Sequence, residues 1–134
     1  MLRVIEIASS IAVSRDWAAE YDENDDLRIE VPTDGQRSQV VNILEGQDRD
    51  GDAVAWIWST IADVSATPDP WALLQLNAEI TYGRIAVRGD DVVLAHTLYD
   101  AMADEDEVGK AIFWVARMAD ELEEQCYGSG VDDM

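Results

Sequence analysis

The stretch from residue 52 to residue 64 constrains the fold more than any other part of the chain. It reads DAVAWIWSTIADV and is rich in β-branched and aromatic residues, which is typical of a β-strand. Side chains alternate between the two faces of a strand, so Trp56 and Trp58 lie on one face and Ile57 and Ile61 on the other. Both faces are apolar. We therefore expect a strand that is covered on both faces, or covered on one face and used for binding on the other.

Four other segments have the composition of strands. They are residues 27–31 (LRIEV), 38–44 (SQVVNIL), 82–88 (YGRIAVR) and 91–99 (DVVLAHTLY). The first alternates apolar and polar residues as a half-buried strand does, and Gly89-Asp90 is a turn pair that joins the last two. Asp50-Gly51 is a similar turn before the strand that begins at residue 52. The sequence therefore predicts five antiparallel strands.

Three segments carry helical signals. Residues 2–12 place apolar side chains three and four positions apart, which gives a wide apolar stripe. Asp69 is a good N-cap and Pro70 suits the first helical position, so a helix is predicted over residues 71–80. The last helix starts at the acidic residues 104–107, because carboxylates stabilise helix N-termini, and it ends near Gly128. Its predicted core stripe is Val108, Ile112, Val115, Ala119 and Leu122.

The order of these elements predicts an α+β fold. Helices pack on an antiparallel five-stranded sheet in the order α-β-β-β-α-β-β-α. With 134 residues, of which 48% are hydrophobic, the chain can build one domain with a proper core. We expect that domain to span residues 1–128, followed by a disordered tail over residues 129–134.

Charge limits the partners of this chain. It has 29 acidic and 9 basic residues, which gives a formal net charge of −20. Such a surface repels phosphate backbones and anionic lipid headgroups, so we expect neither nucleic acid nor membrane as a partner. Two explanations of the acidity stay open. It is either a coat suited to high ionic strength or to genome composition, or it takes part in binding.

Compartment follows from cysteine usage and hydropathy. Cys126 is the single cysteine, so an internal disulfide cannot form and a reducing compartment is the default. The apolar runs are shorter than the roughly 20 residues that span a bilayer, and the start of the chain lacks the apolar core of a signal peptide. A cytoplasmic protein is predicted.

Enzymatic chemistry finds little support in the sequence. His96 is the single histidine and lies mid-strand, where a packed or surface role is commoner than catalysis. Cys126 has acidic neighbours that disfavour its thiolate. Residues 47–52 (QDRDGD) superficially resemble a calcium loop, but Gly46 and Ile57 stand where its first and last ligands belong. We therefore predict a non-enzyme with no catalytic residue, no metal site and no cofactor.

The tryptophans favour a binding surface. Any one of them fits a core position, but together they exceed what one face of a small sheet needs, and tryptophan is a common interface anchor. The strip Trp56, Ile57 and Trp58 is the predicted site for another protein. The helix over residues 71–80 is apolar nearly all round, so a second copy of the chain is expected to cover it. The predicted dimer interface is Trp71, Leu73, Leu74, Leu76 and Ile80.

A family resemblance covers most of residues 1–127 in pattern and is clearest in residues 71–99 and in the terminal helix. The helix with LLQLNAE (73–79), the hairpin YGRIAVRGDDVVLAHTL (82–98) and the terminal helix with ADELEE (119–124) resemble class I type III secretion chaperones of the CesT/Tir type and the related YbjN-like proteins. The resemblance implies the α-β-β-β-α-β-β-α fold, a homodimer, and an activity of holding an unfolded segment of a protein client. Asn77 matches a polar position that recurs in this helix of the family. Its role there is either to cap the helix or form a turn, or to bind a partner, and both alternatives stay open. The first helix is shorter than in those chaperones.

Two hypotheses of function follow. The first is a cytoplasmic, non-enzymatic homodimer that holds an extended segment of an unidentified protein client on apolar strips, with an acidic rim that selects basic segments. The alternative is an acidic nucleic-acid mimic or inhibitor of a basic protein. Apolar contacts survive high salt, whereas binding by a mimic collapses with salt, and this difference separates the two.

Overall fold

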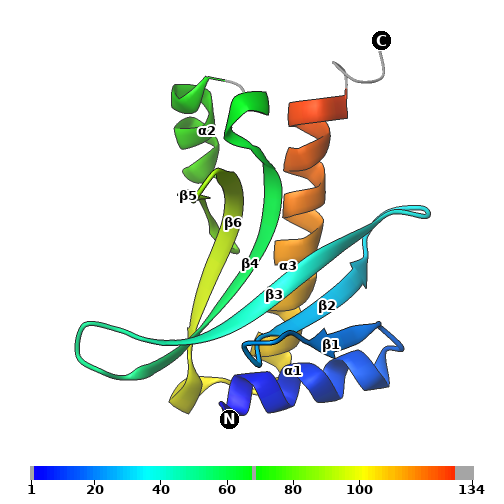
Figure 1. Cartoon of the computed structure of the whole chain (residues 1–134), viewed down its shortest axis with the longest axis vertical. Coiled ribbons are helices and arrows are strands. Elements are labelled where there is room, and N and C mark those ends of the chain that lie inside the picture. The colour runs from blue at the N-terminus through cyan, green and yellow to red at the C-terminus, as the bar shows by residue number, and fades with distance from the viewer. Residues whose placement is uncertain (1, 68, 129–134) are drawn as a thin grey trace.

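An open antiparallel sheet with helices packed against it organises the protein (Figure 1). The computed structural model describes residues 2–67 and 69–128. Within these ranges, three α-helices accompany a six-stranded sheet, so the α+β class is confirmed. The elements in chain order are α1 (Arg3–Ser14), β1 (Ala19–Tyr21), β2 (Leu27–Pro32), β3 (Ser38–Gln47), β4 (Ala53–Asp63), α2 (Pro70–Asn77), β5 (Arg84–Arg88), β6 (Asp91–Tyr99) and α3 (Glu105–Glu123).

The sheet has one strand more than predicted. Its order is β1-β2-β3-β4-β6-β5, with every neighbouring pair antiparallel. The prediction of five strands is wrong because β1 has only three residues, all exposed, and so shows no alternation of polarity. Pairing of Ala19 with Ile29 and of Tyr21 with Leu27 holds β1 on the edge of β2. The predicted tail at residues 129–134 lies outside the described residues.

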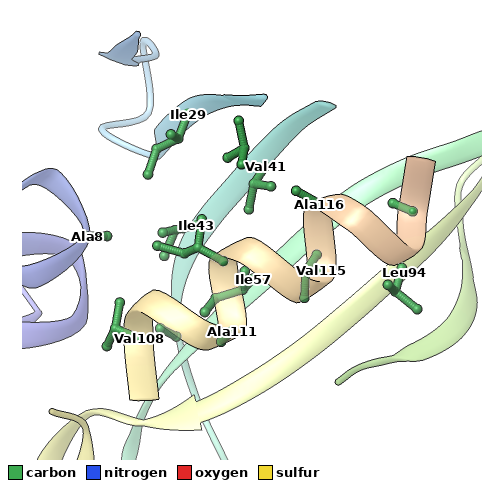
Figure 2. Packing of buried hydrophobic residues seen from close by; sticks show 14 of the residues in the cluster. Ala8, Ile29, Val41, Ile43, Ile57, Leu94, Val108, Ala111, Val115 and Ala116 are labelled. Atoms are coloured by element: carbon green, nitrogen blue, oxygen red, sulfur yellow. The ribbon is translucent and has the colours of Figure 1, made fainter. Parts of the chain in front are cut away.

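The core lies between the helices and one face of the sheet. Strand β2 alternates strictly between buried and exposed residues, and the five residues of the predicted α3 stripe are all buried. Figure 2 shows α3 crossing the sheet, with Val108, Ala111 and Val115 beside Ile43, Ile57 and Leu94. Helix α1 adds Ala8 and its buried neighbours to the same cluster, and α2 adds Leu73. All three helices therefore contribute to one core.

Strands β3 and β4 pair over only half of their length. Their ladder runs from Gln47–Ala53 to Asn42–Trp58, and beyond it β3 pairs with β2 alone while β4 pairs with β6 alone. Side chains replace the lost ladder at this point. Gln39 Nε2 donates to the Thr60 carbonyl at 2.8 Å, and Ser59 Oγ donates to the Val40 carbonyl at 2.6 Å. The two strands thus separate into a wedge, visible in Figure 1 where β3 and β4 splay apart.

Candidate protein-binding face of the sheet

The second face of the sheet carries the predicted binding tryptophans. Helices α1, α2 and α3 all bury side chains on the first face, so in the described part of the chain no helix covers the second. Trp56 and Trp58 both lie on this open face, with Trp56 opposite Leu44 and Trp58 opposite Asn42. Trp56 is 37% exposed and Trp58 is partly buried. Of the two alternatives for β4, the structure therefore has one face covered and one face open.

Ile57 does not belong to this strip. We predicted it as a contact residue together with the two tryptophans, but it is fully buried in the core. The reason is the alternation of β4, which turns Ile57 toward α3 when it turns its neighbours toward solvent. Ile57 is therefore not part of the surface that the open face exposes.

A glycine on β3 makes room for Trp56. The indole ring lies so close over Gly46 that a Cβ at that position would overlap the ring carbons. Gly46 pairs with Val54, two residues before Trp56, so the ring reaches diagonally across the ladder. Aromatic rings that cover a glycine on a neighbouring strand pin the register of the pair. The ring is thereby held against Gly46 of β3, while Trp56 stays 37% exposed.

Arg88 from the edge strand β5 covers Trp58. Its guanidinium lies 4.8 Å from the centre of the indole ring, a cation–π geometry. Within residues 2–67 and 69–128, Arg88 forms no ion pair, although the chain has 29 acids. The indole Nε1 of Trp58 is buried and has no hydrogen-bond acceptor there. Sequence reasoning missed Arg88, because the position of β5 two strands from β4 is set only by tertiary pairing.

An open groove runs from Trp58 into the wedge between β3 and β4. Its volume is about 770 Å³. Its uncharged lining includes Trp58, Val40, Asn42 and Thr60. Charged side chains surround this surface, namely the carboxylates of Asp22, Asp63, Asp91 and Glu123 and the guanidinium of Arg28. Burial, with a smaller contribution from Asp120, raises the pKa of Glu123. The groove therefore joins an indole to a predominantly anionic rim.

Helix α2 exposes only part of the predicted dimer interface. Trp71 is 74% exposed and Leu74 is 56% exposed, as an apolar contact surface requires. Leu73 is buried in the core, and Leu76 and Ile80 are half-buried against it. The helix is also shorter than predicted and ends at Asn77, so Ile80 lies in the following turn. Leu73 is therefore a core residue, and the free surface of α2 centres on Trp71 and Leu74.

Comparison with known families identifies the chain. A family model named YbjN, described as "Putative bacterial sensory transduction regulator", matches residues 7–127. The chain belongs to the YbjN family. No curated protein matches the sequence. In this YbjN-family protein, none of the described helices is both long and apolar enough to cross a membrane.

The two residues weighed for catalysis have other surroundings in this YbjN-family protein. His96 lies on the covered face opposite Ile57 and packs against Tyr82, with ring centres 5.5 Å apart. Burial lowers the pKa of His96, and Glu107 opposes that shift. Burial also raises the pKa of the Cys126 thiol, with a further contribution from Glu123. These shifts favour the neutral imidazole at His96 and the protonated thiol at Cys126.

The β3–β4 turn gathers three carboxylates. Oxygen atoms of Asp48, Asp50 and Asp52 lie within 4.8 Å of one another. Asp48 Oδ1 accepts the backbone N–H groups of Asp50 and Asp52, and its Oδ2 accepts the Tyr99 hydroxyl at 2.7 Å. The Tyr99 hydrogen bond, followed by the backbone ones, lowers the pKa of Asp48. These contacts close the predicted hairpin and tie its tip to the end of β6.

Proposed function

We propose that this YbjN-family protein is a non-enzymatic protein-binding module. It acts as a homodimer and holds an extended segment of another protein on the open face of its sheet, in the manner of a secretion or effector chaperone. The observation that carries the proposal is the exposed Trp56 on a sheet face that α1, α2 and α3 leave uncovered. A sheet face of this kind presents ordered aromatic surface at a low entropic cost for binding.

The neighbours of Trp56 support an extended ligand. Val40 is 36% exposed and Tyr99 is 46% exposed, and both lie on the same open face as Trp56. Strands β3, β4 and β6 thus each expose one large apolar side chain on this face, and apolar residues spaced in this way can contact alternate side chains of an extended segment. Of these three residues, Val40 also lines the groove beside Trp58.

Helix α2 supports the homodimer. From Pro70 to Asn77 it has no charged residue, in a chain of net charge −20. Two copies that meet at this helix bring together the exposed Trp71 and Leu74 and no like charges from the helix itself. Repulsion between two acidic proteins is smallest at such a surface.

A capture experiment tests the binding face. Wild-type protein and a Trp56→Ser variant are used to retain partners at low salt and at about 1 M salt, where charges are screened beyond about 3 Å. Partners held by the wild type at high salt and lost with Trp56→Ser support the proposal. Met102→Ser is the control, because Met102 is 82% exposed and lies in the short helical turn after β6, outside the strands of the sheet. Circular dichroism confirms that each variant is folded.

Two results would contradict this function. If the Trp56→Ser variant retains the same partners, the open face is not the binding site. Loss of all partners from the wild type at high salt favours the acidic mimic instead, since ionic contacts alone are then responsible.

The dimer has its own test. Sedimentation of the wild type is expected to give a dimer, and a Trp71→Ser, Leu74→Ser double variant is expected to give a monomer. Val13→Ser is the matched control, because Val13 is 80% exposed on α1. A monomeric wild type, or a double variant that stays dimeric, contradicts an α2 interface.

A further inference from the structure

We propose that the groove beside Trp58 receives a basic side chain, arginine or lysine, of the bound protein segment. This inference rests on the proposed protein-binding function and adds the chemistry of the ligand. The site consists of the Trp58 indole and the carboxylates of Asp22 and Asp91, with Arg88 as an internal competitor for the ring.

Charge complementarity selects a cation. Four carboxylates line the groove against two guanidinium groups, that of Arg28 in the lining and that of Arg88 over the Trp58 ring, so a basic side chain that enters meets more attraction than repulsion. Concave sites lined by one sign of charge concentrate the field more than a flat surface with the same residues. An acidic side chain would meet the four carboxylates instead. The groove therefore discriminates by the sign of the ligand's charge.

The indole ring already binds a guanidinium in the free protein. Arg88 lies 4.8 Å from the ring centre and forms no ion pair among the described residues. It is the last residue of β5, directly before the turn at Gly89, and its side chain is exposed. A cation of the ligand competes for the same ring, because a cation–π contact uses the ring face whatever chain the cation comes from.

A peptide ligand also supplies what Trp58 lacks. The buried indole Nε1–H has no acceptor among the described residues, and a buried donor without an acceptor is unfavourable. An extended segment brings backbone carbonyl groups, which are hydrogen-bond acceptors, into the groove beside this indole. A free guanidinium compound brings no such acceptor. The site therefore favours a basic residue within a peptide.

The experiment uses a matched pair of peptides. One is a short, end-blocked serine–glycine peptide with a single arginine, and the other has citrulline, which keeps the shape without the charge. Binding is followed by the NMR signal of the Trp58 indole N–H, assigned with Trp58→Phe. We expect a saturable shift with the arginine peptide and at most a weak shift with the citrulline peptide, because backbone carbonyl groups without the charge do not hold the peptide in the groove. An equal response to both peptides, or no response to either, overturns the inference.

Variants separate the groove from the net charge. Asp22→Asn with Asp91→Asn should weaken arginine-peptide binding roughly two- to fivefold, as loss of a modest ionic or cation–π contact does. Glu6→Gln with Glu105→Gln changes the total charge equally, lies outside the groove lining and should leave affinity unchanged. Equal weakening by both double variants would show attraction to the acidic coat as a whole, and the groove would not be the site.

Arg88 gives the sharpest variant. Arg88→Gln removes the competitor and should strengthen arginine-peptide binding roughly two- to fivefold. Arg3→Gln, on α1, makes the same change in charge and is the control. Weaker binding by Arg88→Gln contradicts competition for the ring. The two experiments can fail separately. If the arginine peptide binds but the capture experiment finds no partner that depends on Trp56, the groove site is supported and the proposed function is contradicted. If capture depends on Trp56 but the groove responds equally to both peptides, the proposed function is supported and the groove site is contradicted.

Discussion

The side chain of Asn77 makes both backbone hydrogen bonds of Ile85 on the outer edge of β5. The Ile85 N–H donates to Asn77 Oδ1 at 2.6 Å, and Asn77 Nδ2 donates to the Ile85 carbonyl at 3.3 Å. The amide thus occupies the place of a neighbouring strand and ties the end of α2 to the sheet. Of the two roles left open for Asn77, this geometry supports the structural one, and it blocks one position of an edge open to strand pairing.

Asn77→Ala should therefore destabilise the fold. It leaves the Ile85 amide without its partner, and a lost hydrogen bond to a partly buried group costs about 1–3 kcal/mol. Chemical denaturation measures the effect. Gln75→Ala is the control, because Gln75 is exposed on the same helix. Equal stability of the two variants would mean that water replaces the amide without loss.

Gly46 and Trp56 should be energetically coupled. Gly46→Ala places a methyl group in the Trp56 ring, and overpacking of this kind costs about 1–3 kcal/mol. The cost should vanish in a Trp56→Ala background, where the ring is absent, and a double-mutant cycle measures this coupling.

Gly109→Ala is the matched control for Gly46→Ala. Its Cβ would meet only the end of the Arg15 side chain at 3.3 Å and Ile11 Cδ1 at 3.6 Å. Gly109 lies within α3, where alanine is favoured over glycine by about 1 kcal/mol, so this variant should be neutral or more stable. A cost at Gly46 that survives in the Trp56→Ala background would assign it to the strand backbone.

His96 should make stability depend on pH. Burial lowers its folded pKa below the usual 6.5, Arg84 adds to that shift and Glu107 opposes it. The unfolded chain therefore takes up a proton first, and the His96 contribution falls as pH drops below 6.5. His96→Gln lacks this proton uptake. Relative to that variant, the wild type should lose stability between about pH 7.5 and pH 5, as measured by denaturant titration. A constant difference across this range contradicts the prediction.

The turn between β2 and β3 should depend on Arg37. Its Nε and Nη2 donate to Asp120 Oδ2 at 3.2 and 3.0 Å, and its Nη1 donates to Glu124 Oε1 at 3.1 Å. Arg37→Ala leaves the buried Asp120 carboxylate without these partners and should lower the denaturation midpoint. Asp34→Asn tests the exposed contact at 3.8 Å and should have little effect. The same midpoint for both variants would show that Asp120 needs no cation.

Local sequence patterns predicted most elements because they depend on neighbours in the chain. The alternation of residues 27–31 and the stripe of α3 report which side of each element is buried, whatever its partner. The N-cap at Asp69, whose side chain accepts the Trp71 N–H, is equally local. Strand β1 was missed because three exposed residues carry no pattern, and only pairing with β2 makes them a strand.

In the candidate site, too, local patterns predicted some features, and contacts between distant segments determined the others. Period-two alternation placed Trp56 and Trp58 on one face of a strand, and the same rule should have removed Ile57 from the strip. The separation of β3 and β4, the cover of Arg88 and the groove carboxylates come from strands and loops far apart in sequence. No periodicity within one segment reports such contacts.

The sequence by itself determined a charged, folded α+β protein of the YbjN family with a β4 strand that is apolar on both faces. Only the tertiary structure decided which of those faces the helices cover and which stays open. The physical reason is that alternation shows which residues share a face, but it does not show which face is buried when both faces are apolar. The choice depends on where α3 buries its stripe, and that is a property of the packed chain.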